Sequence, residues 1–267
     1  MDIHLIGANG FIGKSIQKIN NKFNIVPWSH QSKEKKYFLD LYKEDSWERF
    51  FLTKPKKVIL LSWPGLPNYM ETFHLTKNLF YSIKFIEKLV ELNVEKIVVA
   101  GTCFEYGNIN GCLEESIMTN PTSLYGIAKD SLRKTAFSII EGTSTKLCWI
   151  RIFYPFGEGQ NPNSLIPSLV RAIKNKEKYF NLSSGRQIRD FINVKDLANN
   201  FLQIIDSPKS NGIYNCGSGN PLSISEFVKN KVEELNSDIS LNFGSMPDRQ
   251  DEPIAFWANM NKFKELL

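Results

Sequence analysis

The sequence predicts an α/β fold in which a doubly wound parallel sheet is joined to a smaller C-terminal lobe. Short apolar runs alternate with amphipathic stretches along the chain, a pattern typical of β-α-β units. The run Val58–Leu61 is continuous in apolar residues, as expected for a strand buried on both faces. Ahead of it, Ile12, Ile16 and Ile19 are spaced to line one face of a helix.

The strands and helices of the sheet follow from the same patterns. Strands are expected at Ile3–Ile6, Phe23–Val26, Tyr37–Leu41, Val58–Leu61, Ile97–Ala100 and Leu147–Phe153. A long helix is expected over Leu75–Leu92, with a buried stripe formed by Leu75, Leu79, Ile83, Ile86 and Leu89. A further helix begins near Leu124. Two β-α-β-α-β halves therefore fit into about the first 150 residues, as a doubly wound sheet requires.

The composition of the sequence changes after Phe153. Prolines and glycines punctuate a loop-rich stretch, and Ser223 and Glu226 form a capping-box pattern before a helix that runs through Leu235. We expect a sheet domain over residues 1–155, to which the chain returns around residues 188–210. Residues 156–267 are expected to form mainly a lobe that builds a substrate pocket.

Charge and cysteine content limit the possible partners and locations. The net charge of +5 comes from scattered side chains, which indicates a solvated surface rather than a nucleic-acid patch. The four cysteines lack metal-ligand spacing, so we expect free thiols and no metal site. With no signal peptide and no apolar run long enough to cross a bilayer, the chain is expected to be cytoplasmic. His4 and His74 are expected at a strand edge and a helix flank.

A glycine-rich turn stands between the first strand and the first helix. It reads Gly7-Ala-Asn9-Gly10-Phe11-Ile12-Gly13. In such a turn the glycines allow a tight bend, close approach of the backbone to a pyrophosphate, and tight packing of helix on strand. The amides that open the helix favour the diphosphate. The sequence therefore predicts a dinucleotide cofactor on a Rossmann sheet.

The choice between NADPH and NADH depends on the end of the second strand. NAD-binding folds usually carry an acidic residue there, and Val26–Lys33 contains none. Ser29, His30 and Lys33 are candidates for holding a 2′-phosphate, which favours NADPH over NADH. The alternative for His30 and Lys33 is an ordinary surface loop. Asp40 is a candidate partner of the adenine amine or a turn residue.

Tyr125 and Lys129 are the candidate catalytic pair. Their spacing puts a phenol and an ammonium on one face of a helix, where the ammonium favours a lower pKa of the phenol. Thr102 follows the fifth strand, where its hydroxyl is placed either to bind a reacting oxygen or to cap the strand end. Asn78 lies in the preceding helix.

These residues, together with five ordered segments, resemble the extended branch of the short-chain dehydrogenase/reductase family, of the NAD-dependent epimerase/dehydratase type. The segments are Gly7–Gly13, Gly101–Gly107, Arg151–Gly157, Arg189–Asp196 and Tyr214–Gly219. The resemblance implies Thr102, Tyr125 and Lys129 as the catalytic group. It also implies cofactor contacts from Leu41, Leu61, Ser62, Trp63, Asn78 and Tyr154.

Members that act on nucleotide sugars bind the diphosphate with two arginines, which correspond here to Arg189 and Arg249. Further substrate contacts implied by the resemblance are Trp63, Cys103, Phe104, Asn163 and Leu165. Trp63, Phe104 and Tyr154 are equally suited to wall a sugar pocket or to pack in the core.

The reaction type follows from the residues after Thr102. The 4,6-dehydratase relatives carry an Asp-Glu pair there, whereas this chain has Cys103 and Phe104. The resemblance therefore favours a 4-ketoreductase that uses NADPH or NADH to reduce a nucleotide-linked 4-keto-6-deoxyhexose, in 6-deoxysugar synthesis for surface polysaccharide. The alternatives are a nucleotide-sugar 4-epimerase with tightly bound NAD and a non-catalytic NADP-sensing protein. A homodimer through Leu75–Leu92 and Leu124–Glu141 is also implied.

Overall fold

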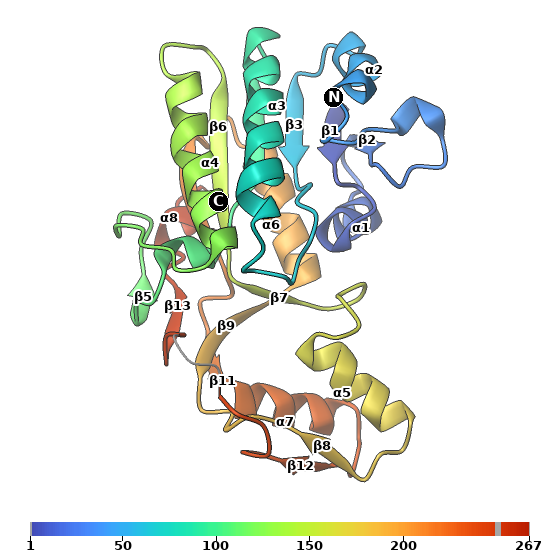
Figure 1. Ribbon diagram of the computed structural model, residues 1–267, viewed down its shortest axis with the longest axis vertical. Coiled ribbons are helices and arrows are strands. Elements are labelled where there is room, and N and C mark those ends of the chain that lie inside the picture. Colours follow the sequence, from blue (N-terminus) through green and yellow to red (C-terminus); the bar gives the residue numbers. More distant parts are fainter. Residues whose placement is uncertain (1, 249–251, 267) are drawn as a thin grey trace.

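The computed structural model describes residues 2–248 and 252–266, and within this part of the chain six parallel strands form a central sheet (Figure 1). The strand order is β10-β6-β4-β3-β1-β2, and all neighbouring pairs are parallel. The strands are β1 (Asp2–Ile6), β2 (Asn24–Trp28), β3 (Lys57–Leu60), β4 (Lys96–Ala100), β6 (Lys146–Ile152) and β10 (Gly212–Cys216). This sheet confirms the predicted doubly wound α/β fold.

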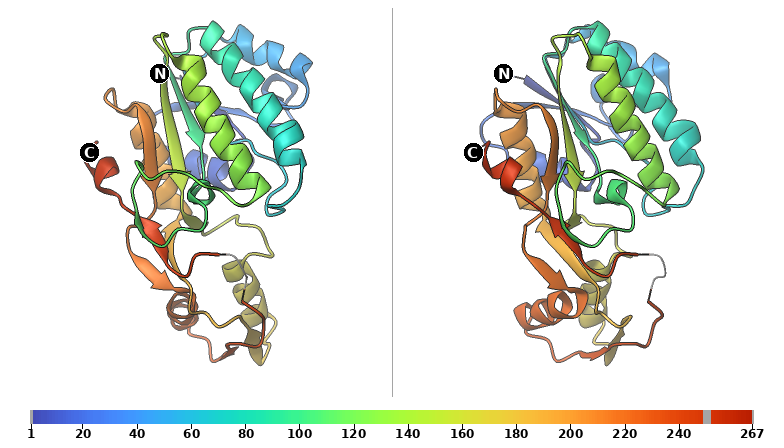
Figure 2. Two further views of the ribbon diagram at one scale, coloured as in Figure 1. Left: turned by 60° about the vertical axis from the view of Figure 1, so that its left-hand side comes forward. Right: turned by 90° about the vertical axis from the view of Figure 1, so that its left-hand side faces the viewer.

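Helices cover both faces of the sheet, as Figure 2 shows. One layer holds α1 (Phe11–Ile19) and α6 (Val194–Asp206), and the other holds α2 (Glu48–Leu52), α3 (Phe80–Glu91) and α4 (Leu124–Ile140). Strand β4 shows how the layers are separated, because Val98 and Ala100 pack in one apolar cluster while Ile97 and Val99 pack in the other. Successive side chains of a strand point to opposite faces, so a continuous apolar run fills both layers.

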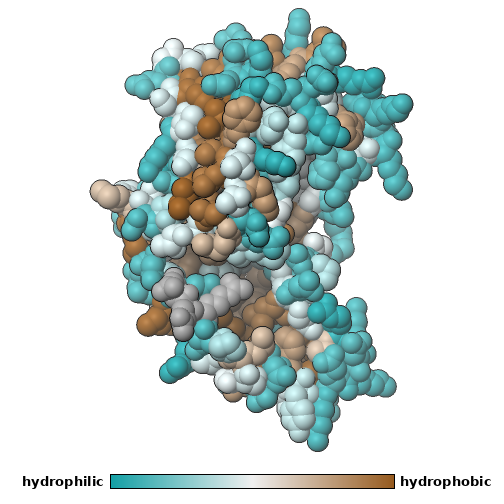
Figure 3. All heavy atoms as spheres, in the orientation of Figure 1, coloured by the Kyte–Doolittle hydropathy of each residue, from teal (hydrophilic) through white to brown (hydrophobic). Residues whose placement is uncertain are grey.

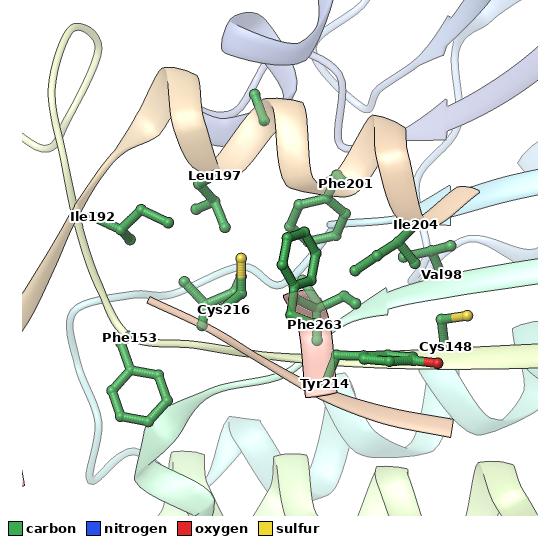
Figure 4. Packing of buried hydrophobic residues seen from close by; sticks show 14 of the residues in the cluster. Val98, Cys148, Phe153, Ile192, Leu197, Phe201, Ile204, Tyr214, Cys216 and Phe263 are labelled. Carbon is green, nitrogen blue, oxygen red and sulfur yellow. The ribbon is translucent and has the colours of Figure 1, made fainter. Parts of the chain in front are cut away.

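Helix α6 closes one face of the sheet with residues from late in the chain. Figure 4 shows Leu197, Phe201 and Ile204 projecting from α6 toward the strands that carry Cys148 and Tyr214. All three α6 side chains are fully buried. The β10 strand that follows α6 pairs with β6 and completes the sheet.

The predicted strand at Tyr37–Leu41 is wrong. The segment forms a short 3₁₀ turn, η1 (Lys35–Tyr37), and a single bridge between Ser29 and Phe38. Leu39 and Leu41 alternate because both side chains are buried in the core, and the pairing of this segment is limited to the bridge, in which the Leu39 amide donates to the Ser29 carbonyl. The sixth strand of the sheet is β10 instead, so the two β-α-β-α-β halves are not both contained in the first 150 or so residues.

The helix expected over Leu75–Leu92 starts with a π-helical segment, η3 (His74–Leu79), before α3. The wider turn rotates the first part of the helix, so that His74 and Asn78 face the interior while Leu75 and Leu79 are only partly buried. The buried stripe was therefore predicted correctly at Ile86 and Leu89 but wrongly at the start of the helix.

Both expected histidine positions are wrong. His4 lies in β1, which is flanked on both sides by β2 and β3, and its Nδ1 accepts a hydrogen bond of 3.1 Å from Trp28 Nε1. His74 has an exposed fraction of 0%, and its ring contacts that of Tyr125. Each imidazole has a hydrogen-bond partner in the core, which the spacing of apolar residues alone does not reveal.

The C-terminal lobe lies beyond the carboxyl ends of the sheet strands, at the bottom of the view in Figure 1. Its elements are β7 (Tyr154–Phe156), α5 (Leu165–Lys174), β8 (Tyr179–Asn181), β9 (Ile188–Asn193), β11 (Pro221–Ser223), α7 (Ile224–Glu234) and β12 (Ser240–Asn242). Strands β11, β9 and β7 form one small sheet, and β12 and β8 form another. The predicted capping box of Ser223 and Glu226 is confirmed at the start of α7.

The remaining elements tie the two parts together. Strand β5 (Gly111–Leu113) pairs with β13 (Phe256–Ala258), and helix α8 (Asn261–Lys264) packs near β10. Short 3₁₀ segments are η2 (Glu44–Trp47) and η4 (Cys103–Tyr106). Among the described helices, none combines the length and apolar character needed to cross a membrane.

Candidate active site

The turn between β1 and α1 has the close backbone approaches that its glycines suggested. Gly7 has a φ of +87°, and a side-chain carbon built on it lies 2.9 Å from the Ser62 amide nitrogen, beside Leu61. A carbon built on Gly13 lies 2.5 Å from the Gly7 carbonyl oxygen. Gly10 begins α1 without a side-chain cap. The cradle therefore depends on glycine, and the amides at the helix start fit a diphosphate.

The other members of the expected cofactor site lie around this turn. Asn9 is in the turn itself, and Phe11 and Ile12 open α1. His30 and Lys33 are exposed beyond the end of β2, whereas Ser29 is buried. The Asp40 carboxylate accepts a hydrogen bond of 3.0 Å from the amide two residues later, which is the turn role that the sequence left open.

Thr102, Tyr125 and Lys129 meet at the carboxyl end of β4. Thr102 directly follows the strand, and Tyr125 and Lys129 occupy successive turns at the start of α4, whose first turn is capped by Ser123. The Thr102 hydroxyl hydrogen-bonds Tyr125, and Lys129 Nζ donates to the Ala100 carbonyl at 2.8 Å. Exposed fractions of 6% for Tyr125 and 3% for Lys129 show that the pair is largely shielded from water.

Burial controls the protonation of the pair. It raises the pKa of the Tyr125 phenol, and the hydrogen bond from Thr102 only partly opposes this. This direction is opposite to the lowering expected from the sequence. Burial also lowers the pKa of Lys129 to about 7, against the opposing charge of Glu105. A phenol that stays protonated at neutral pH is suited to donate a proton.

Glu105 anchors the charged side of the site. Its carboxylate is fully buried and accepts hydrogen bonds from the Thr102 amide at 2.9 Å, Trp149 Nε1 at 2.8 Å and Arg151 Nε at 2.9 Å. Thr102 in turn accepts from the Phe104 amide, so the two residues form a capping box around η4. These hydrogen bonds hold the segment that follows β4 in one position.

Aromatic side chains form the side of the site opposite Glu105. The Trp63 ring lies 3.8 Å from Lys129 Nζ and contacts Tyr125 edge-on at 6.1 Å. Trp63 Nε1 donates to His74 Nδ1 at 3.1 Å. Asn78 lies beside His74, donates to the Pro64 carbonyl and accepts a short hydrogen bond from Tyr42.

A line of ring contacts joins Tyr125 to the C-terminal lobe. Tyr125 contacts Phe104 at 6.1 Å, and Phe104 contacts Tyr154 at 6.3 Å. Tyr154 receives a hydrogen bond of 3.0 Å from Arg189 Nε, in β9. Phe104 and Tyr154 are both partly exposed, so they line the site as well as pack in it.

Arg189 is buried, with an exposed fraction of 1%, and its guanidinium is occupied by protein groups. Besides Tyr154, it donates to the carbonyls of Ile188 and Ile254 and pairs with the Glu252 carboxylate at 3.0 Å. A diphosphate would therefore compete with Glu252 for this guanidinium. Arg249, the second arginine expected to bind substrate, lies outside the described residues.

The other expected substrate residues are not all brought together. Cys103 is buried near Arg189, and burial raises the pKa of its thiol. Asn163 is exposed, and Leu165 packs in a separate apolar cluster of the lobe. The structure therefore groups the expected catalytic residues tightly and leaves the expected nucleotide-lining segment apart from them.

Sequence reasoning missed three residues near the site: Tyr69, Glu105 and His74. Tyr69 stacks on Phe104 at 5.0 Å, and its carbonyl accepts from the Tyr125 amide. Glu105 was detectable, because Thr102 and Glu105 have capping-box spacing. His74 and Asn78 stand four residues apart, but two polar residues at that spacing give no sign that they face the core.

The comparison with family models decides the relationship. Residues 3–217 match the model of the NAD dependent epimerase/dehydratase family. The chain belongs to this family. The predicted resemblance is therefore confirmed.

The curated relatives act on nucleotide sugars. The chain is 30% identical over 270 residues to the dTDP-6-deoxy-L-talose 4-dehydrogenase (NAD(+)) of Aggregatibacter actinomycetemcomitans, covering 97% of this chain and 99% of the relative. It is 27% identical to the GDP-6-deoxy-D-talose 4-dehydrogenase of the same organism, covering 94% and 84% of the two chains.

Solved structures share the fold. The UDP-glucose 4-epimerase of Thermotoga maritima, solved with UDP-glucose, has a TM-score of 0.86 at 21% identity, covering 99% of this chain and 92% of that one. RMD from Pseudomonas aeruginosa, complexed with NADPH, has a TM-score of 0.84 at 17% identity, with 99% and 91% covered. At these identities the likeness concerns the fold alone.

Proposed function

We propose that this protein reduces the 4-keto group of a nucleotide-linked 4-keto-6-deoxyhexose with NADPH or NADH, in the synthesis of a 6-deoxysugar for surface polysaccharide. The observation that carries the proposal is the buried group of Thr102, Tyr125 and Lys129, with a phenol held in its protonated form. The names of the two 4-dehydrogenase relatives support it, because a 4-dehydrogenase running in reverse is a 4-ketoreductase.

The residues divide the work of the reaction among them. When bound, the reduced cofactor supplies a hydride to carbon 4 of the sugar. Tyr125 donates its phenolic proton to the carbonyl oxygen, and Thr102 donates a hydrogen bond to the same oxygen. Lys129 would hold the ribose hydroxyls of the bound cofactor. Arg189 holds the diphosphate, so that binding energy far from carbon 4 orients the hexose. Residues 156–267 mainly supply the walls of this substrate pocket.

Other reactions of the family fit less well. Dehydration needs an acid pair after Thr102, and the structure has there a buried thiol of raised pKa and a phenylalanine ring, Cys103 and Phe104. A 4-epimerase is the second candidate, favoured by the same Thr-Tyr-Lys group and by the family itself.

The choice of cofactor belongs to the proposal as well. Exposed His30 and Lys33 near the end of β2, without a carboxylate in Val26–Lys33, favour NADPH. The name of the talose 4-dehydrogenase relative favours NAD instead. We propose NADPH on the residues of this chain and test it directly.

We also propose that the protein is a homodimer formed by α3 and α4. Figure 3 shows an apolar band on this face of the molecule, where Phe80 is 50% exposed and Ile83 and Phe137 are partly exposed. Burying such a band against its own copy across a two-fold axis forms a four-helix contact. Light scattering should give twice the chain mass, and Phe80→Glu should give a single chain mass; a single mass for both proteins contradicts the dimer.

The activity is tested by the absorbance of the reduced cofactor. Purified protein is mixed with NADPH or NADH and a panel of 4-keto-6-deoxyhexoses on different nucleotides. Rapid oxidation with one nucleotide sugar establishes the ketoreductase, and the faster cofactor settles the preference. If no sugar is reduced, and denatured protein releases NAD while the native protein interconverts two 4-epimers, the epimerase replaces the proposal.

A further inference from the structure

His74 is a fully buried histidine to which the proposed mechanism assigns no task. Its Nδ1 faces two groups that can only donate, Trp63 Nε1 at 3.1 Å and Asn78 Nδ2 at 3.2 Å. Its Nε2 lies 2.9 Å from the Asn68 carbonyl, which can only accept. The ring is therefore neutral and protonated on Nε2. Burial lowers the pKa of His74, which keeps it in this form.

This imidazole holds the Trp63 indole in place. The two ring planes are nearly parallel, at 12° with centroids 6.2 Å apart, and the indole nitrogen donates a hydrogen bond to His74 Nδ1. On its other flank the indole meets Tyr125 edge-on. Trp63 thus has one orientation, with its face directed at Lys129 Nζ.

The indole face matters because the Lys129 ammonium is shielded from solvent. Inside the protein the ammonium has a hydrogen bond to the Ala100 carbonyl and the π face of Trp63, 3.8 Å away. A cation–π contact acts on the charged form only, and it is strongest for tryptophan and for a desolvated cation. The ring therefore opposes the loss of charge that burial favours.

We propose that Trp63 and His74 are a positioning pair that keeps Lys129 in its charged form: the indole face contacts the ammonium, and the imidazole fixes the indole in that position. The titratable groups around Lys129 are Glu105 from η4, Tyr125 one turn earlier in α4, and His74 itself from η3. Since His74 is neutral and Tyr125 stays protonated, Glu105 is the charged group among them. The proposal rests on the proposed function for the task of Lys129.

The test compares Trp63→Phe with Trp63→Leu. Phenylalanine keeps a π face. Leucine has none, and it fills an apolar space similar to that of phenylalanine. The ¹⁵Nζ resonance of Lys129, assigned by its absence in Lys129→Met, is titrated in lysine-labelled protein. The titration midpoint should fall by about one pH unit in Trp63→Leu and by less in Trp63→Phe. Equal midpoints in the three proteins, or a rise from Trp through Phe to Leu as entering water would cause, overturn the proposal.

A second pair tests His74. In His74→Asn the amide oxygen replaces Nδ1 as an acceptor for the indole, so the midpoint should stay close to that of the unchanged protein. In His74→Leu no acceptor remains, and the midpoint should fall as in Trp63→Leu. Thermal unfolding shows whether each variant is folded. If His74→Leu does not fold, His74→Asn carries this part of the test, and a midpoint as low as that of Trp63→Leu contradicts the role of His74.

The pH dependence of turnover gives the functional readout. Because charged Lys129 is the active form, kcat should fall on the alkaline side, and the fall should begin at lower pH in Trp63→Leu by the same shift as the resonance. A structural defect alone lowers kcat equally at all pH values. The NMR titration needs no substrate, so a failure of the proposed reaction and a failure of this inference remain distinguishable.

Discussion

At the central sheet, Thr102, Tyr125 and Lys129 are held by buried hydrogen bonds to neighbouring groups of the sheet domain. In the C-terminal lobe, Arg189 is held by Tyr154 and by the partly exposed carboxylate of Glu252. The first arrangement has all its partners before any substrate arrives. In the second, the proposed diphosphate would have to compete with Glu252 for the guanidinium. The difference teaches that changes in the sheet layer should act on turnover, and changes at Arg189 on substrate binding.

The largest effect expected from this comparison is that of Tyr125→Phe. The ring contacts remain, but the proton donor is lost, so kcat should fall by roughly 10²–10⁴-fold. Binding of the reduced cofactor, followed by its fluorescence, should change little. Tyr179→Phe, at an exposed position of the lobe, is the control. Full turnover in Tyr125→Phe would remove the basis of the proposed function.

Replacing Glu105 tests whether Thr102 is held rigidly at the end of β4. Arg151 is 1% exposed, so Glu105→Ala leaves a buried guanidinium without its carboxylate. The free energy of unfolding should fall by about 3–5 kcal/mol. Glu105→Gln keeps an acceptor for the Thr102 amide, and it should lose less stability and retain more turnover. Chemical denaturation and kcat measure the two effects, and equal losses in both variants would show that the position of Thr102 does not depend on this acceptor.

The same contrast explains what the sequence could predict. The glycine turn and the Tyr125–Lys129 pair follow from spacings of a few residues within one segment of the chain, and the structure has both elements. The strand at Tyr37–Leu41 was wrong because alternating burial of Leu39 and Leu41 arises equally from packing without pairing. Strand β10 joins the sheet only after the chain has passed through the lobe, and no local pattern shows such a return.

At the site, the missed contacts were those between distant segments. His74 and Asn78 continue the buried face of α3 into η3, so polar side chains occupy the positions where apolar ones were expected. The ion pair between Arg189 in β9 and Glu252 joins two segments that are more than 60 residues apart in the chain. Residue types suggested an arginine that binds substrate, but only the structure shows what the guanidinium contacts first.

Arg189→Lys gives the smallest expected effect and sharpens the comparison most directly. Lysine keeps the positive charge for Glu252 but loses the fork that can bind two phosphate oxygens. Losing one charge-assisted hydrogen bond of about 1.5–3 kcal/mol should raise KM by about 10- to 150-fold. Turnover at saturating substrate should change only a few-fold, because Tyr125 and Lys129 are positioned by the sheet layer. Arg186→Lys, at an exposed site nearby, should leave both constants unchanged. If Arg189→Lys lowers kcat with KM unchanged, the lobe positions the reacting groups too, and the division of tasks between the two regions fails.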